Sequence, residues 1–290
     1  MSNKENDKKY SAYGMYILSL LIFGTNGFYV SHISLAASHI VLMRTLIGGA
    51  LLTLLVLLRG GFDKTSIYEE RIPLLIGGTT LGLNWIALFE AYRVLNVSLA
   101  TLIYYVGPIL VLLCSPILFH EKLTGRKWIS VLIVAIGLVN ISGSIVVTGM
   151  NIPGLGIAMI SAFLYAVLIV FNKQITRTSG MQTAAVELNV AFAVVLMYAL
   201  STAGIPHITV RDLPYIVVIG FVNTGVAYLL YFSGLQKLSG QSVALISYLD
   251  PVSALLFSAL LLHEVMTSAQ AIGAVLIIGG AMLGEIRPRG

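Results

Sequence analysis

The chain has 290 residues, of which 58% are hydrophobic and 10% are charged, and its formal net charge is +5. Soluble domains carry roughly 25% charged residues, so this composition excludes a soluble globular fold and indicates an integral membrane protein. The positive charge forms no basic cluster on a soluble domain, so we expect no nucleic-acid partner. The single cysteine, Cys114, excludes an internal disulfide.

Ten apolar stretches follow one another along the chain, and each is close to the roughly 20 residues that a helix needs to cross a bilayer. The polar start, Met1–Lys9, is not followed by a cleavage pattern of small residues, so we expect the first span to be retained. The predicted spans are Gly14–Ile33, His39–Leu58, Pro73–Tyr92, Val97–Phe119, Trp128–Val147, Leu155–Gln174, Thr183–Ala203, Pro214–Gly234, Val243–Leu262 and Ala269–Ile286.

The positive charges predict the orientation in the membrane. If the N-terminus is cytoplasmic, fourteen Lys and Arg residues fall on cytoplasmic segments, and only Arg93 and Arg211 fall on outer segments. Cytoplasmic loops of membrane proteins carry such an excess of positive charge. The sequence therefore predicts that both termini are cytoplasmic.

The chain contains an internal repeat. The segment Leu102–Thr124 recurs 143 positions later as Leu245–Thr267, with identical residues at 11 of 23 positions. Each half has an odd number of spans, so the second copy enters the membrane in the opposite sense. We therefore expect an all-α membrane protein of ten transmembrane helices in two inverted repeats, 14–147 and 155–286. Inverted repeats around a site at the membrane midplane are a recurrent design of transporters.

The same segments carry a resemblance to a known family. The run Ala-Thr-Leu-Ile-Tyr-Tyr-Val-Gly-Pro at Ala100–Pro108, followed by His-Glu-Lys-Leu-Thr at His120–Thr124, resembles the first half of an EamA-type permease of the drug/metabolite transporter superfamily. Its counterpart in the second half is Ser-Tyr-Leu-Asp-Pro at Ser247–Pro251, with His-Glu-Val-Met-Thr at His263–Thr267.

The resemblance implies a secondary carrier of small organic molecules, often an exporter, built as a ten-helix inverted repeat. It implies a multi-pass protein of the plasma (inner) membrane of a prokaryote, with the lipid bilayer and a small-molecule substrate as partners. It does not imply a particular substrate, because the shared motifs are mostly structural.

Two prolines interrupt matching spans. Pro108 and Pro251 sit near the middle of the fourth and ninth spans, where each frees the carbonyl four residues earlier, at Tyr104 and Ser247. These sites are either packing kinks or part of a crevice that binds the substrate.

Asp250 could cap a helix that restarts at Pro251. As a carboxyl group near mid-membrane, it could also bind a coupling proton, or it could be a fixed structural carboxylate.

Three other charged residues fall inside predicted spans: Arg44, Glu90 and Glu187. Arg44 and its repeat mate Glu187 enter from opposite faces, so we expect them about half a membrane apart. Arg44 and Glu90 are expected either to pair with each other or simply to snorkel towards the outer interface. Glu187 is expected to reach the inner interface, towards Lys173 or Arg177. Gating or coupling is the alternative interpretation for all three.

Several aromatic residues lie well inside the spans rather than at the interfaces where aromatic belts collect. Two pairs, Tyr105 with Tyr248 and Trp85 with Tyr228, are repeat mates. Their ring faces and hydroxyl groups could hold an amphipathic or cationic metabolite from both halves, although aromatics at helical spacing also fill cores. The expected substrate-binding residues are Tyr105, Tyr248, Asp250, Trp85, Tyr228 and Asn84.

Other site motifs are missing. Neither His120–Glu121 nor His263–Glu264 is followed by the second His of a zinc helix, and there is no phosphate loop or Gly-x-Ser-x-Gly. We therefore expect no metal, no cofactor and no enzymatic activity. Gly280–Gly284 is a weak signal for close helix packing, within the chain or between protomers, so a monomer and a homodimer both remain open.

These observations predict a secondary transporter that moves a small organic metabolite, such as an amino acid, by alternating access. Coupling to protons through Asp250 is a further hypothesis. The alternatives are an intramembrane enzyme that acts on a lipid-like substrate, for which no convergent nucleophile and base can be assembled, and a channel.

Overall fold

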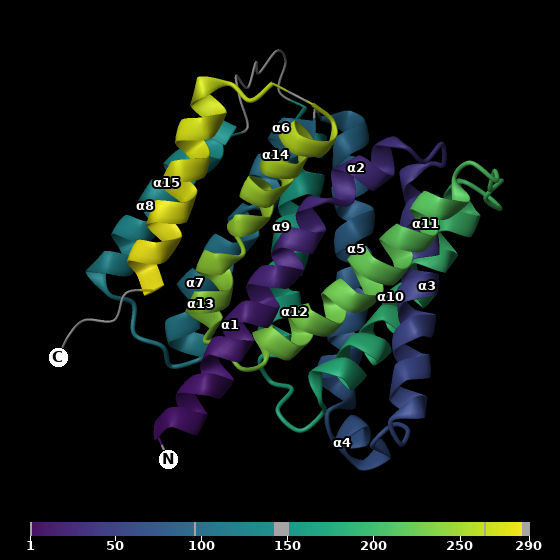
Figure 1. The fold of residues 1–290 in the computed structure, drawn as a ribbon, viewed down its shortest axis with the longest axis horizontal. Coiled ribbons are helices and arrows are strands. Elements are labelled where there is room, and N and C mark those ends of the chain that lie inside the picture. The colour runs from purple at the N-terminus through teal and green to yellow at the C-terminus, as the bar shows by residue number, and fades with distance from the viewer. Residues whose placement is uncertain (1, 96, 142–150, 264, 286–290) are drawn as a thin grey trace.

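The structure is a computed structural model that describes residues 2–95, 97–141, 151–263 and 265–285. Within these residues the chain forms helices and no strand (Figure 1). The all-α membrane fold is thus confirmed. The start of α1 (Ser2–Gly24) and the end of α15 (Ser268–Glu285) lie at the lower end of the bundle in Figure 1. We call this the inner end, following the predicted orientation.

The other helices of the first half are α2 (Asn26–Ser31), α3 (Ala37–Leu58), α4 (Lys64–Glu69), α5 (Arg71–Val94), α6 (Val97–Tyr104), α7 (Val106–Leu118) and α8 (Gly125–Ile141). Those of the second half are α9 (Ile152–Asn172), α10 (Gly180–Thr202), α11 (Leu213–Gly220), the π-helix η1 (Phe221–Val226), α12 (Ala227–Leu235), α13 (Gly240–Ile246) and α14 (Leu249–Leu261).

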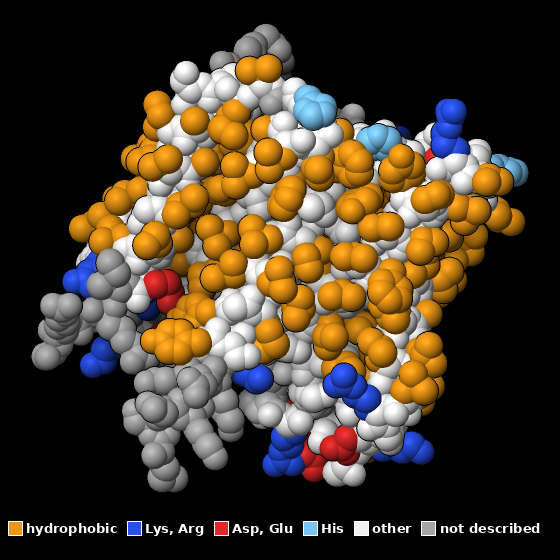
Figure 2. Space-filling view, viewed as in Figure 1, with side chains coloured by type: hydrophobic (Ala, Val, Ile, Leu, Met, Phe, Trp, Pro, Cys, Tyr) orange, Lys and Arg blue, Asp and Glu red, His pale blue; other side chains and the backbone are white. Residues whose placement is uncertain are grey.

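Nine helical segments in the described part of the chain are long and apolar enough to cross a membrane. The remaining predicted span, Trp128–Val147, overlaps α8, but its last residues lie outside the described part. The number of ten spans and the orientation therefore stay predictions. Figure 2 shows hydrophobic side chains across the middle of one face and most of its visible Lys and Arg side chains at the inner end, as expected of a bilayer-spanning protein.

The repeat is visible in how the helices pack. The 143-residue shift relates α3 to α10 and α8 to α15, and each of these helices packs against its own mate. Ser130 of α8 lies beside Gly280 and Gly284 of α15, whereas Gly137 lies beside Gly273, so the two helices run antiparallel. Antiparallel mates are what two halves of opposite membrane sense require.

Small residues allow α8 and α15 to approach closely. The Ser130 hydroxyl donates to the Gly280 carbonyl at 2.6 Å. A Cβ added at Gly280 would lie 2.8 Å from Val134 and 3.1 Å from the Ser130 carbonyl, too close for a side chain without movement. These glycines therefore serve a contact inside the chain.

The fourth and ninth spans both break near their prolines. The helix is interrupted at Tyr105, between α6 and α7, and again after Ile246, between α13 and α14. Pro108 and Pro251 are each the third residue of the restarted helix, where a missing N–H costs little. The carbonyl of Ser247 accepts the N–H of Asp250 at 3.0 Å.

The expectation that Asp250 caps a helix restarting at Pro251 is wrong. The helix restarts at Leu249, its N-cap is Tyr248, and no side chain caps it. Asp250 is instead the second residue of α14, still in the first turn, where the helix dipole favours a negative charge.

Candidate functional site

Two pairs of repeat mates meet between the halves. The rings of Tyr105 and Tyr248 have centroids 6.0 Å apart, and those of Trp85 and Tyr228 lie edge to face at 5.7 Å. In a two-fold arrangement, a residue that touches its own mate lies beside the axis. The pairs therefore mark the pseudo-two-fold axis of the molecule. We call these four residues, together with Asp250, the central group.

Asp250 is half-buried beside the first of these pairs. The Tyr105 hydroxyl donates to its Oδ2 at 3.1 Å, and the Tyr248 hydroxyl donates to the Tyr105 carbonyl oxygen at 2.8 Å. The two broken spans are thus joined where both helices are interrupted. The repeat mate of Asp250 is Gly107, where a Cβ would lie 2.8 Å from the Ala162 carbonyl oxygen, so this position has no room for an equivalent side chain.

A second set of hydroxyls anchors the break in the ninth span. The Oγ of Ser247 lies 2.8 Å from the hydroxyls of both Tyr16, on α1, and Tyr165, on α9, and it donates to the Val243 carbonyl at 2.7 Å. Our sequence reasoning did not select Tyr16, Tyr165 or Ser247 as site residues. Their position inside predicted spans was the available signal, but it does not distinguish residues beside the break from residues in the core.

Arg44 is buried and reaches the second half. Its Nε donates to Thr224 Oγ1 at 2.9 Å, a terminal nitrogen lies 3.5 Å from the Asn223 carbonyl, and its guanidinium stands 5.1 Å from the centroid of Trp85. Thr224 belongs to η1, and its hydroxyl also donates to the carbonyl of Ile219, five residues earlier. π-helical turns of this kind often occur at functional sites.

The predicted pair between Arg44 and Glu90 is wrong. Glu90 forms an ion pair with Arg93 at 3.0 Å, one turn further along α5, and accepts a hydrogen bond from the Tyr198 hydroxyl. Arg44 packs on Trp85, which lies five residues before Glu90, or about 7.5 Å along the helix axis. Its guanidinium therefore faces a deeper level of the bundle than the carboxylate does.

The prediction for Glu187 is also wrong. Its side chain does not reach the inner interface but is fully buried, and its Oε2 accepts from the Asn172 amide at 3.1 Å. Lys173 instead donates to backbone carbonyls that include that of Leu235, and Arg177 pairs with Glu69. The reason is rotational, because α10 turns this face towards α5 and α9 rather than towards the water.

Asn84 does not join the central group. Its amide donates to the carbonyl of Ser161 at 2.7 Å, and the Ser161 hydroxyl donates back to the Asn84 carbonyl at 3.2 Å. The side chain is buried in the α5–α9 contact, so its amide nitrogen is held by protein rather than turned to a ligand.

The inner ends of the fourth and ninth spans are fastened together. The Glu121 carboxylate accepts the N–H groups of Gly240 at 2.7 Å and Gln241 at 2.9 Å, the first residues of α13. The side chain of Gln241 donates to Ser115 Oγ at 2.7 Å and accepts from Lys127. Every residue of α13 is buried, so this conformation is closed at the inner end.

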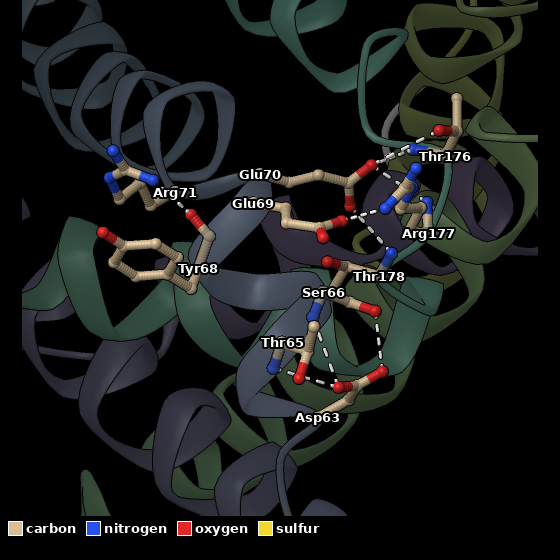
Figure 3. A network of polar contacts seen from close by, with 10 residues as sticks. All are labelled: Asp63, Thr65, Ser66, Tyr68, Glu69, Glu70, Arg71, Thr176, Arg177 and Thr178. Carbon is tan, nitrogen blue, oxygen red and sulfur yellow. Dashed lines mark hydrogen bonds and ion pairs between the residues drawn. The ribbon is translucent and has the colours of Figure 1, made fainter.

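A carboxylate also ties the two halves together beside α4 (Figure 3). Glu70 accepts the N–H groups of Thr176 at 2.7 Å, Arg177 at 2.9 Å and Thr178 at 2.8 Å. Partial burial favours its neutral form, but the hydrogen bonds from these three N–H groups, Arg177 first, outweigh it and lower the pKa of Glu70 to about 2. The connection between α9 and α10 is therefore held to α5.

The outer end carries a related contact. Asp212 accepts the N–H of Ser34 at 2.9 Å, and Ser34 is the repeat mate of Arg177. This N–H and the Thr209 hydroxyl lower the pKa of the Asp212 carboxyl. Each end of the bundle thus has a carboxylate of one half bonded to a loop of the other.

A cavity of about 310 Å³ opens at the outer end between α3, α5 and α10. Val41, Phe89 and Val195 form part of its apolar wall, and Glu90 and Arg93 are its charged residues. Val41 and Val195 belong to the same packed cluster as Trp85, so the cavity lies above the central group on its outer side. Among the described residues, no cluster of His, Cys, Asp or Glu could hold a metal ion.

Comparison with known families gives a match over nearly the whole chain. The sequence model of the EamA-like transporter family matches twice, at residues 10–143 and 152–284. A crystal structure with 21% sequence identity shares the fold, with a TM-score of 0.84 over 95% of this chain and 97% of the other.

Curated relatives are similar along most of their length. "Uncharacterized transporter YxxF" of Bacillus subtilis (strain 168) is 27% identical over 94% of this chain and 89% of its own length. "Probable amino-acid metabolite efflux pump" of Salmonella typhimurium (strain LT2) is 28% identical over 74% and 77% of the two chains. "Protein PecM" of Dickeya dadantii (strain 3937) is 24% identical over 72% and 71%.

Proposed function

The chain belongs to the EamA-like transporter family, and from this we propose that it carries a small zwitterionic metabolite, an amino acid or a similar compound, by alternating access. Family membership makes the protein a membrane transporter rather than an enzyme and confirms the resemblance seen in the sequence. The substrate class, the direction of transport and the coupling are our proposal.

One observation carries the proposal: repeat mates from both halves touch at the pseudo-two-fold axis, beside a carboxylate. A site on this axis is the place that both halves reach in either of two related conformations. The rings of Tyr105, Tyr248, Trp85 and Tyr228 would hold the apolar part of a metabolite. The substrate would thus contact both halves at once.

The charges favour a zwitterion. Arg44 stacks on Trp85 at one side of the central group, and a buried guanidinium is suited to bind a carboxylate. Asp250, at the other side, would receive an ammonium group. A zwitterion would place one opposite charge beside Arg44 and one beside Asp250, so the charge of each protein group would be compensated. The name of the Salmonella relative, a probable amino-acid metabolite efflux pump, supports the same substrate class and an export direction.

We propose that Asp250 also takes part in proton coupling. It is half-buried within a span, and the hydrogen bond that the described residues give to its carboxylate comes from the Tyr105 hydroxyl. Substrate ammonium and proton would compete for the same carboxylate. Asp250→Asn should bind the ammonium group more weakly, and the transport that remains at high substrate concentration should not respond to a pH gradient in proteoliposomes. If this variant transports and responds as the parent does, Asp250 has no role in coupling.

Closure at the inner end supports a cycle in which substrate reaches the central group from outside in this conformation. The Glu121 contact on α13 would have to open for exchange with the other side. The bacterial relatives lead us to propose the plasma membrane as the location of this multi-pass protein.

The decisive experiment has two steps. Purified protein is screened by thermal shift against amino acids and other small metabolites, and hits are then tested in proteoliposomes for saturable exchange of labelled against unlabelled compound. Saturable exchange is expected of a carrier. Flux that neither saturates nor exchanges would indicate a channel and overturn the proposal.

A further inference from the structure

We propose that Glu187 and Asn172 form a proton-binding site, separate from the central group, in which Glu187 is held as a neutral acid in this conformation. The role of this site in transport rests on the proposed function. Its existence as a proton site does not, because it can be tested without a substrate.

The first observation is burial without sufficient partners. Glu187 and Asn172 are both fully buried. Glu187 Oε2 accepts from the Asn172 amide at 3.1 Å, while Glu187 Oε1 and Asn172 Oδ1 have no hydrogen-bond partner within the described part of the chain. An ionised carboxylate with one donor is costly in such a place, and protonation removes the charge.

The second observation concerns the neighbouring charges. From α5, the residues that face Glu187 are Gly77 and Gly78, which carry no charge. From α9, Asn172 is followed by Lys173, whose ammonium group donates to the carbonyls at the end of α12. From α12, the titratable group within range is Tyr228.

Within the described part of the chain, no ion pair balances the Glu187 carboxyl group. Ion pairs between described residues join Arg93 with Glu90 and Arg177 with Glu69. Arg44 is the repeat mate of Glu187 and makes its contacts with η1 and Trp85. Equivalent positions of the two halves thus hold a permanent cation and an acid without a basic partner.

Space favours a proton over a metal cation. A Cβ at Gly77 would overlap Glu187 Oε1, so the carboxyl group lies directly against the α5 backbone. Hard metal cations collect several oxygen ligands, whereas the described residues offer two unpartnered oxygens here, and a Cβ at Gly77 would lie 2.1 Å from one of them. A proton needs no such set of ligands.

Movement of the connection that follows Asn172 would give the site a route to the inner side. Asn172 ends α9, and the connection that follows it is the one that Glu70 holds through the N–H groups of Thr176, Arg177 and Thr178. If this connection moves when the inner end opens, water reaches Asn172 first and Glu187 next. The acid would then release its proton to the inner side.

A carbodiimide reports such a group directly. Dicyclohexylcarbodiimide partitions into apolar regions and reacts with protonated carboxyl groups: the acid proton moves to a carbodiimide nitrogen, the carboxylate oxygen bonds to the central carbon, and the adduct rearranges to a stable N-acylurea. We expect labelling of Glu187 in the parent protein in proteoliposomes, mapped by mass spectrometry, at about pH 6 and still at about pH 8.

Glu90 provides the matched control, because it lies in a span but is ionised by its pair with Arg93 and should not label. Glu187→Gln should lose the adduct, and its transport should no longer respond fully to a pH gradient.

Absence of the adduct at Glu187 in the parent, with labelling at Asp250, would overturn the proposal. Protection by sodium ions at constant pH would also overturn it, in favour of a cation site. Failure to find any transported substrate would overturn the proposed function but leave the labelling result standing.

Discussion

The hydroxyl of Tyr248 donates a hydrogen bond to the backbone carbonyl of Tyr105, its own repeat mate, at 2.8 Å. The contact joins the interrupted fourth span to the interrupted ninth, and it lies beside the carboxylate of Asp250. Two breaks that would each weaken a single helix are therefore stabilised by one another.

Removing this hydroxyl should loosen the central group. Tyr248→Phe is expected to cost about 1 kcal/mol of stability, since one hydrogen bond in a membrane protein contributes about that much. The melting temperature of the purified protein measures the effect. Tyr104→Phe is the matched control, because the described residues give the Tyr104 hydroxyl no hydrogen-bond partner. Equal melting temperatures for the two variants would contradict the prediction.

The Glu70 contact should make stability depend on pH. The pKa of Glu70 is lowered to about 2, so its stabilising effect is complete above its ordinary value of 4.5 and is lost as the pH falls towards about 2. At about pH 7, Glu70→Gln should lower the free energy of unfolding by roughly 2 kcal/mol, which a lower melting temperature would report. The difference in melting temperature between the variant and the parent should become smaller in acid.

Glu69→Gln is the control for this prediction. Its ion pair with Arg177 is exposed, with 44% and 65% of the two side chains accessible, and exposed pairs contribute about 0–1 kcal/mol. A larger loss in Glu69→Gln than in Glu70→Gln would show that the backbone N–H groups are not what holds the connection.

Arg44 should determine whether a carboxylate is recognised. The parent is expected to bind a zwitterionic amino acid better than the amine that lacks its carboxylate, by ten-fold or more, since hydrogen bonds to charged groups contribute about 1.5–3 kcal/mol. Arg44→Gln should remove this preference, whereas Arg93→Gln should retain it. Binding is measured by thermal shift. An unchanged preference in Arg44→Gln would place the carboxylate elsewhere.

The contact between α8 and α15 offers a pair of adjacent glycines. A Cβ at Gly280 meets Val134 and the Ser130 carbonyl, whereas a Cβ at Gly279 meets nothing within 4 Å. Gly280→Ala should destabilise the protein by about 1–3 kcal/mol through overpacking. Gly279→Ala should be neutral or stabilise by up to about 1 kcal/mol. Similar melting temperatures for both variants would argue against this close contact.

The repeat made much of the architecture predictable. A fixed shift of 143 residues predicts which helices are mates, and the matching prolines predict breaks at equivalent depths. The contacts of Tyr105 with Tyr248 and of Trp85 with Tyr228 concern residues that the repeat had already paired. Their role in binding stays a prediction.

Side-chain partners were less predictable, because they depend on the rotation of each helix about its own axis. Arg44 bonds to Thr224 because the π-helical η1 carries an extra residue in its turn, a change of register that no apolar pattern reveals. Glu187 faces inwards because Gly77 leaves room for its carboxyl group. The depth of a residue in the membrane can be estimated from the sequence. The direction in which its side chain faces is known only once the helices are packed together.

The crowding at Gly107 makes the two halves chemically different at the central group, because only the second half carries a side chain at the equivalent position, Asp250. The two halves repeat one another in sequence, yet one half has an acid at this position and the other cannot fit a side chain there. A cargo with different ends would therefore sit in one orientation whichever side it arrived from. It would leave with the same end leading as entered first, so the gate on each side would meet a chemically different end of the same molecule.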